Sequence, residues 1–192
     1  MKLFKGYSAE RSYGEERIPA GNYIGEIKNA KVEQTQYGDF LVIAFDITEG
    51  EFAGYFQEKY DRATGDSKKW RGTCRVRIPD EKSQYYESEK RSFENMMFAI
   101  EDSNRGFHFD SEGTEAQLKG KTAGFLSRDK EFKNVFGEVI TFTEFVSFAS
   151  ANDVRDGKVK PLKAKLLKPE EKPTETEYSD FTPIPTDDDI PF

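Results

Sequence analysis

Residues 55–77 combine basic side chains with aromatic rings at short intervals. Cations attract phosphate groups, and a flat ring can stack on an unpaired base, which contributes roughly 1–3 kcal/mol per base. Trp70, the only tryptophan, stands between Lys69 and Arg71. This setting favours a surface-mounted ring, although a packing anchor would explain it as well. The residues of this tract predicted to contact nucleic acid are Tyr55, Lys59, Tyr60, Arg62, Lys68, Lys69, Trp70, Arg71, Arg75 and Arg77.

A second tract of the same kind spans residues 128–137. Its cations could reach phosphates while Phe132 and Phe136 clamp bases between them. A local hydrophobic cluster that closes a hairpin explains the two rings nearly as well, so both interpretations stay open. The residues of this tract predicted to contact nucleic acid are Arg128, Lys130, Phe132, Lys133 and Phe136.

The chain ends on three carboxylates followed by an Ile-Pro-Phe sequence. Eight acidic residues and one basic residue follow Lys168, so this segment carries the whole net charge of −7 and residues 1–168 are neutral. A solubilising tail needs charge but no terminal apolar residues. A partner protein with an apolar slot rimmed by Lys or Arg could bind both the ring and the carboxylates. The predicted protein-interaction site is Asp187, Asp188, Asp189, Ile190, Pro191 and Phe192.

The side chains that enzymes use for covalent chemistry are sparse. His108 lacks the companions of a zinc site or a catalytic triad, and Cys74 is the only cysteine. No glycine-rich phosphate loop occurs. The Pro-Asp pair at 79–80 and the Glu-x-Lys pattern at 131–133 imitate metal-dependent nucleases, but such short patterns arise easily when 34% of residues are charged. We expect no catalysis, no metal and no cofactor, with a nuclease as a distant third function.

Polar and apolar residues alternate in several segments, which is the pattern of half-buried strands. The clearest is 40–48, where Leu41, Ile43, Phe45 and Ile47 share one face that we assign to the core. The predicted strands are residues 20–33, 40–48, 52–62, 118–129 and 138–148.

One segment changes to a helical period. Phe93, Met96, Met97 and Ile100 recur at helical spacing and predict a core-packed helix over 88–104. A helix between the third and fourth of five strands is the order of the OB-fold. The predicted fold class is therefore all-β with one helix, a five-stranded OB-fold barrel with an additional arm or hairpin and a disordered C-terminal tail. Stretches outside the minimal barrel are 1–19 and 63–87, and within the latter 73–78 could form an extra strand or a hairpin arm.

Several segments resemble single-stranded-DNA-binding proteins of phages and mobile elements. The resemblance covers roughly residues 4–150 and rests on Pro-Ala-Gly-Asn-Tyr at 19–23, on residues 40–56 and on Leu-Lys-Gly-Lys at 118–121. The last six residues resemble the acidic C-terminal tip of bacterial single-stranded-DNA-binding proteins. This resemblance implies a protein that coats and protects single strands during replication and recombination and recruits enzymes through its tail.

Composition divides the chain into an OB-fold domain at 1–150 and a proline-rich, disordered linker and interaction tail at 151–192. The sequence shows no signal peptide and no membrane-spanning run, so we expect the cytoplasm of a bacterial host cell and no membrane partner. The expected partners are single-stranded DNA and replication or recombination proteins. The sequence is compatible with a homo-oligomer but does not determine the oligomeric state. The main alternative is an OB-fold adaptor that binds replication proteins without strong DNA binding.

Overall fold

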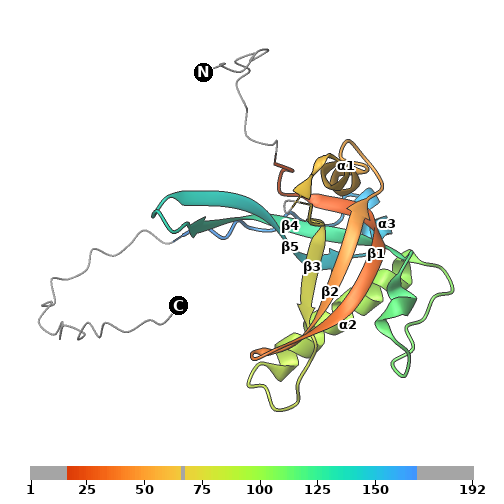
Figure 1. The fold of residues 1–192 in the computed structure, drawn as a ribbon. Coiled ribbons are helices and arrows are strands. Elements are labelled where there is room, and N and C mark those ends of the chain that lie inside the picture. The colour runs from red at the N-terminus through yellow and green to blue at the C-terminus, as the bar shows by residue number, and fades with distance from the viewer. Residues whose placement is uncertain (1–16, 66–67, 168–192) are drawn as a thin grey trace, which may run out of the picture.

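The computed structural model describes residues 17–65 and 68–167 (Figure 1). The predicted interaction site at 187–192 lies outside these residues. In chain order the elements are β1 (Asn22–Thr35), β2 (Gly38–Ile47), α1 (Tyr55–Arg62), β3 (Thr73–Arg77), α2 (Tyr86–Ser103), the short 3-10 helix η2 (Glu115–Leu118), β4 (Thr122–Lys133), β5 (Val139–Ala149) and α3 (Ala151–Arg155).

All five strands belong to one antiparallel sheet in the order β3-β2-β1-β4-β5. The central strand, β1, pairs with β2 along most of its length and with the first half of β4. The two edges are β3 and β5, and no ladder joins them among the described residues, so the sheet is not closed. The prediction of a β-rich fold with five strands is confirmed, whereas the closed barrel and the single helix are not.

The core lies between the curled sheet and α2. The apolar face predicted for 40–48 is buried there. The ring of Phe45 stacks on that of Phe125 with centroids 3.7 Å apart, and the ring of Phe145 meets it edge-on at 4.9 Å. Because these three rings come from β2, β4 and β5, their packing holds the two halves of the sheet together.

The helix α2 covers the core as its sequence period predicts. Met96, Met97 and Ile100 are buried. At the end of the helix, the side-chain amide of Asn104 donates to the carbonyl oxygens of Ile100 and Thr122, both at 2.7 Å. Its side-chain oxygen accepts the N–H of Thr122 at 3.0 Å. One residue therefore satisfies main-chain groups at the helix end and sets where β4 begins.

The strand predicted at 52–62 is wrong, because α1 occupies most of this segment. Gly54, with φ 78°, makes a left-handed turn that a side chain would disfavour, and the helix follows directly. The carboxylate of Asp46 on β2 accepts the N–H of Phe56 at 3.0 Å and that of Ile47 at 2.9 Å. A side chain from another element thus caps this helix. The third strand of the sheet is instead β3. For residues 73–78, where the sequence allowed an extra strand or a hairpin arm, the structure therefore has a strand.

Residues 151–167 lie in defined contact with the sheet, where the sequence predicted a disordered linker. After α3, residues 158–167 run back over the sheet, and we call them the strap. The side-chain amide of Asn22 donates to a main-chain carbonyl oxygen of the strap at 2.8 Å. Lys165 of the strap forms a parallel β-bridge with Lys130 of β4. These contacts are made largely through the main chain of the strap, which is why its polar composition did not reveal them.

Candidate nucleic-acid interface

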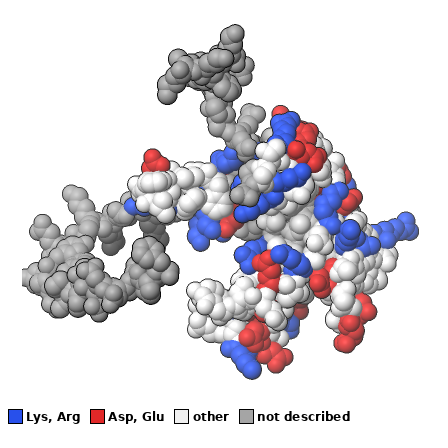
Figure 2. Space-filling view, viewed as in Figure 1, with Lys and Arg blue, Asp and Glu red and all other residues white. Residues whose placement is uncertain are grey.

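A groove of about 620 Å³ runs along the seam between the edge strands β3 and β5. It exists because the sheet does not close here, and α1 forms one end of it. Figure 2 shows basic side chains gathered around α1 and where the β4–β5 hairpin leaves the body. The lining side chains suited to binding a polyanion with flat bases are Arg17, Tyr55, Lys59, Arg71, Arg75 and Phe142.

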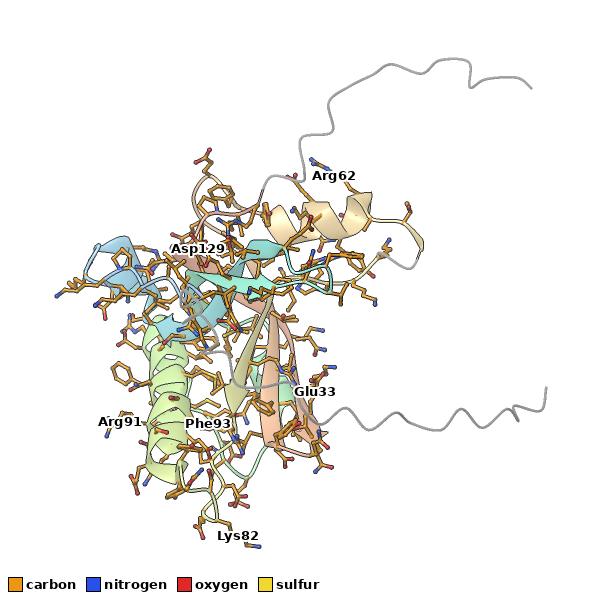
Figure 3. All side chains as sticks on the ribbon, turned by 90° about the vertical axis from the view of Figure 1, so that its left-hand side faces the viewer. Glu33, Arg62, Lys82, Arg91, Phe93 and Asp129 are labelled. Atoms are coloured by element: carbon orange, nitrogen blue, oxygen red, sulfur yellow. The ribbon has the colours of Figure 1, made fainter. Side chains whose placement is uncertain are left out.

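The groove continues beside α1 into a hollow of about 540 Å³. The hollow shares Lys59 and Arg71 with the groove and adds Arg62 and Lys69. Arg62 projects outward from α1 (Figure 3), where it pairs with Glu58 at 3.0 Å, one helical turn away. The structure therefore brings residues of the first predicted tract together on one continuous surface.

At its other end the groove meets a hollow of about 330 Å³ that contains a ring the sequence analysis missed. Phe40 faces away from the core on β2, and the strand register places it opposite Arg77. The guanidinium groups of Arg75 and Arg77 lie 5.0 Å and 5.8 Å from the centre of its ring. Arg75 also donates to Glu33 at 3.0 Å. This aromatic ring beside two cations is suited to stacking on a base.

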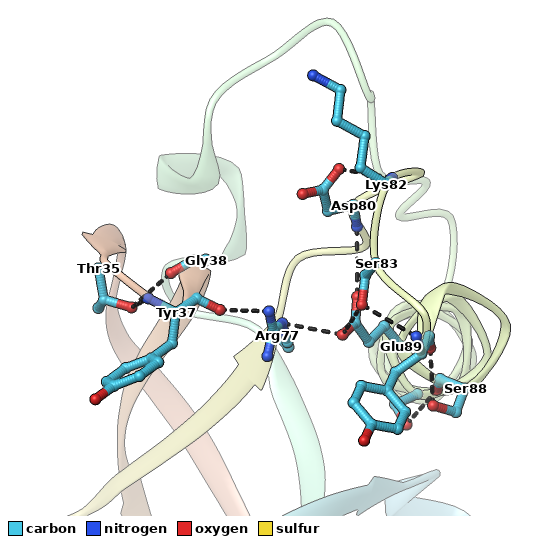
Figure 4. Close-up of polar contacts among 11 residues, drawn as sticks. Thr35, Tyr37, Gly38, Arg77, Asp80, Lys82, Ser83, Ser88 and Glu89 are labelled. Carbon is cyan, nitrogen blue, oxygen red and sulfur yellow. Dashed lines mark hydrogen bonds and ion pairs between the residues drawn. The ribbon is translucent and has the colours of Figure 1, made fainter.

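Arg77 has a structural role as well (Figure 4). Its Nε lies 3.0 Å from Oε1 of Glu89, whose side chain is almost fully buried at the edge of α2. The same guanidinium donates to the carbonyl oxygen of Tyr37 in the β1–β2 turn. Ser83 adds a hydrogen bond of 2.9 Å to Glu89. Arg77 thus ties the turn to the helix, so less of its donor capacity remains for a phosphate than the sequence suggested.

The aromatic side chains around α1 are partly committed to packing. The indole N–H of Trp70 lies within hydrogen-bonding distance of the carbonyl oxygens of Gly72, at 3.0 Å, and Phe45, at 3.2 Å. Its half-buried ring lies 5.7 Å from that of Tyr60, over which the ammonium of Lys68 sits at 4.8 Å. These contacts match the packing-anchor alternative for Trp70, and part of its ring still faces solvent.

The cations at the base of the hairpin share one carboxylate. Arg128 donates to Glu144 at 3.1 Å and 3.2 Å, and Lys130 donates to it at 2.6 Å. Partial burial alone would raise the pKa of Glu144, but the two cations outweigh that effect and lower it. Glu144 lines the groove, whereas Arg128 and Lys130 on β4 are not among its lining residues, and Glu144 balances much of their charge.

The outer end of the hairpin lies beyond the groove. The ring of Phe132 meets that of Phe142 edge-on at 5.5 Å, so it touches a residue of the groove wall. Phe136 is 84% exposed in the turn that follows β4, and Lys133 is exposed at the end of that strand. The structure therefore places Phe132 against the groove wall and Phe136 in the exposed turn, and the clamp between the two rings stays a prediction.

Charge is segregated along the groove and its two hollows. Seven basic side chains line them against four acidic ones. Three of the four acids, Glu58, Glu89 and Glu144, already form ion pairs with basic residues. Since residues 1–168 are neutral as a whole, this excess of cations is local to the groove. Such a field attracts phosphates even though the whole chain is acidic.

Compared with known proteins, the sequence matches no family model and no curated protein. Within 17–65 and 68–167 no three His, Cys, Asp or Glu side chains gather closely enough to hold a metal ion. Asp80, half of the nuclease-like pattern, accepts the main-chain N–H of Lys82 at 3.0 Å in its own turn (Figure 4). None of the helices in the described part of the chain is long and apolar enough to cross a bilayer.

Proposed function

We propose that this protein binds single-stranded DNA in the groove between β3 and β5. The observation that carries the proposal is the local excess of cations beside partly exposed rings, of which Tyr55, Phe40 and Phe142 are spread along the groove. Cations that follow a phosphate backbone and rings that stack on successive bases are the two requirements of sequence-tolerant single-strand binding.

The fold supports this proposal through its strand order. With α2 between β3 and β4, the order β3-β2-β1-β4-β5 would become the five-stranded OB barrel if β3 and β5 met. We infer a partly open barrel of this type, with the groove at the seam. OB-folds bind oligonucleotides on the face of their second and third strands and with the β1–β2 and β4–β5 loops. Phe40, Arg75 and Arg77 lie on that face.

The biological role follows from the resemblance to single-stranded-DNA-binding proteins of phages and mobile elements. The protein coats and protects single strands during replication and recombination in a bacterial host cell. Its acidic tip at 187–192 recruits partner proteins. The alternative of an adaptor that binds only proteins is favoured by one observation, the strongly exposed apolar turn that contains Val135 and Phe136.

A titration with oligo-dT separates these functions. The full chain is mixed with dT oligomers of increasing length at two salt concentrations, and binding is followed by the emission of Trp70 and by the anisotropy of labelled DNA. We expect binding that weakens with salt, as counterion release requires. Failure to bind polythymidine even at low salt would contradict the proposed function and favour the adaptor that binds only proteins. Mg²⁺-dependent cleavage of the labelled strand would indicate a nuclease.

A matched pair of double variants tests the location of the site. Arg71→Ala with Arg75→Ala removes two groove cations, and Lys82→Ala with Arg91→Ala removes two cations that lie away from α1 (Figure 3). Each lost phosphate contact should reduce the slope of log K against log salt by about 0.7. The groove variant should therefore lose about 1.4 from the slope, while the control keeps the wild-type value. Equal slopes for both variants would place the DNA elsewhere.

A further inference from the structure

The outer end of the β4–β5 hairpin and the neighbouring strap expose an unusual number of large apolar side chains. Seven of the eleven large hydrophobic residues that are exposed among the described residues lie here. In Figure 1 this hairpin projects away from the body, and Figure 2 shows much of its surface free of charged groups. We call these residues the hairpin patch: Phe132, Val135, Phe136, Val139, Ile140, Leu166 and Leu167.

The hairpin patch has the size of a protein interface. Val135 is 94% exposed, Phe136 84% and Leu166 60%. With side-chain areas on the order of 150–250 Å² each, the exposed fractions of the seven residues amount to roughly 600–1000 Å² of mostly apolar surface. The largest apolar patch on a typical monomer is about 300–600 Å², and each partner of a standard interface contributes about 800 Å². A surface of this size is suited to a protein partner.

Its chemistry also favours protein over nucleic acid. Five of the seven residues are aliphatic and offer no flat ring on which a base could stack. The segment 130–141 contains two lysines and two glutamates and is therefore neutral. A polyanion gains little from such a surface, whereas two copies of it can approach each other without net repulsion.

The two edges of the hairpin differ in whether another segment covers them, and this difference indicates which strand a partner could pair with. The edge of β4 is covered by the strap, because the N–H of Glu131 donates to the carbonyl of Lys165 at 3.1 Å and the N–H of Lys165 donates to that of Asp129 at 2.7 Å. Among the described residues β5 pairs only with β4. Its outer part, from Val139 to Thr141, thus presents main-chain groups that no other described strand pairs with, beside exposed apolar side chains, a combination that attracts another strand.

We propose that two copies of this chain associate through this edge, with the outer part of β5 pairing antiparallel to the same strand of the second copy. A two-fold axis makes the contact self-complementary, because each copy supplies the same edge and the same hairpin patch. The paired edges gain ladder hydrogen bonds, and the combined apolar area reaches the range of a standard interface. On β5 the groove is lined from Phe142 onward, whereas the proposed pairing uses Val139 to Thr141, and the proposal does not depend on DNA binding.

Sedimentation of the full chain over a range of concentrations, without DNA, tests the proposal. We expect a monomer–dimer equilibrium. Ile140→Asp places a charge in the hairpin patch and should raise the dissociation constant about 100-fold. The matched control is Phe98→Asp, which changes a residue of α2 that is 66% exposed and lies outside the patch. The control should dimerise as the wild type does. Circular dichroism checks that both variants stay folded, and binding of a short dT oligomer should be unchanged by Ile140→Asp.

Cross-linking locates the contact independently. Thr141→Cys places a thiol at the β5 edge, and Phe98→Cys serves as its control. The native Cys74 contributes little background, because it is buried and burial raises the pKa of its thiol to about 12. A short bis-maleimide should link Thr141→Cys into dimers and leave Phe98→Cys monomeric. A chain that stays monomeric up to about 100 μM, or a dimer that survives Ile140→Asp, would overturn the proposal, whatever the outcome of the DNA titration.

Discussion

The Asp46→Ala variant would remove the acceptor that caps α1. Asp46 is 5% exposed, and its Oδ1 accepts two main-chain N–H groups, that of Ile47 at 2.9 Å and that of Phe56 at 3.0 Å. The N–H of Phe56 belongs to the first turn of α1, where N–H groups have no partner within the helix. Alanine leaves both donors without their acceptor in the interior of the protein.

The size of the effect follows from the number of donors. A buried N–H group without a partner costs roughly 1–3 kcal/mol. For two such groups we expect the free energy of unfolding to fall by about 2–4 kcal/mol, since the chain relaxes partly around the lost side chain. Asp46→Asn keeps an oxygen of the same shape in the same place. It should cost only about 1 kcal/mol, because a neutral acceptor forms weaker hydrogen bonds than a carboxylate.

Urea unfolding of both variants, followed by far-ultraviolet circular dichroism, measures these differences. Oligo-dT affinity should fall in the alanine variant more than in the asparagine variant, because α1 places Tyr55 and Lys59 in the groove. If the two variants unfold with free energies within about 0.5 kcal/mol of each other, the carboxylate does not cap α1, and our explanation of why residues 55–62 are helical is wrong.

Two further variants test the packing and the charges of the groove. Gly72→Ala would place its Cβ 2.4 Å from the carbonyl oxygen of Phe45 and 2.5 Å from the ring of Phe56, so thermal unfolding should show a loss of about 1–3 kcal/mol, and an unchanged melting temperature would contradict this packing. Glu144→Gln removes the negative charge that Arg128 and Lys130 share. Oligo-dT should then bind more tightly and with a steeper salt dependence, whereas unchanged binding would show that neither cation contacts DNA. Because the folded-state pKa of Glu144 is lowered, its charge stabilises the fold above the pKa of the unfolded chain, and this contribution is lost as the pH falls through the folded pKa; a pH series of urea unfolding should show less acid sensitivity in Glu144→Gln.

The spacing of apolar residues was sufficient to predict an element and its core-facing side where that element buries a single face. The alternation at 40–48 and the helical period at 93–100 are confirmed, because each pattern follows from the geometry of its own backbone. Pattern failed at 52–62, where aromatic and basic residues suit a strand or a helix equally well. There the helix is favoured by the carboxylate of Asp46, which lies on β2 and accepts a main-chain N–H of the first turn of α1.

The candidate site shows the same division. The amino-acid types of residues 55–77 were enough to predict a basic and aromatic surface, because they depend on composition alone. Tertiary structure decided that Phe40 joins Arg75 and Arg77, since that contact arises from the pairing of β2 with β3. It also decided that Glu144 balances two of the predicted cations. Contacts between strands depend on register, and register is set by the packing of the whole sheet, which no single segment encodes.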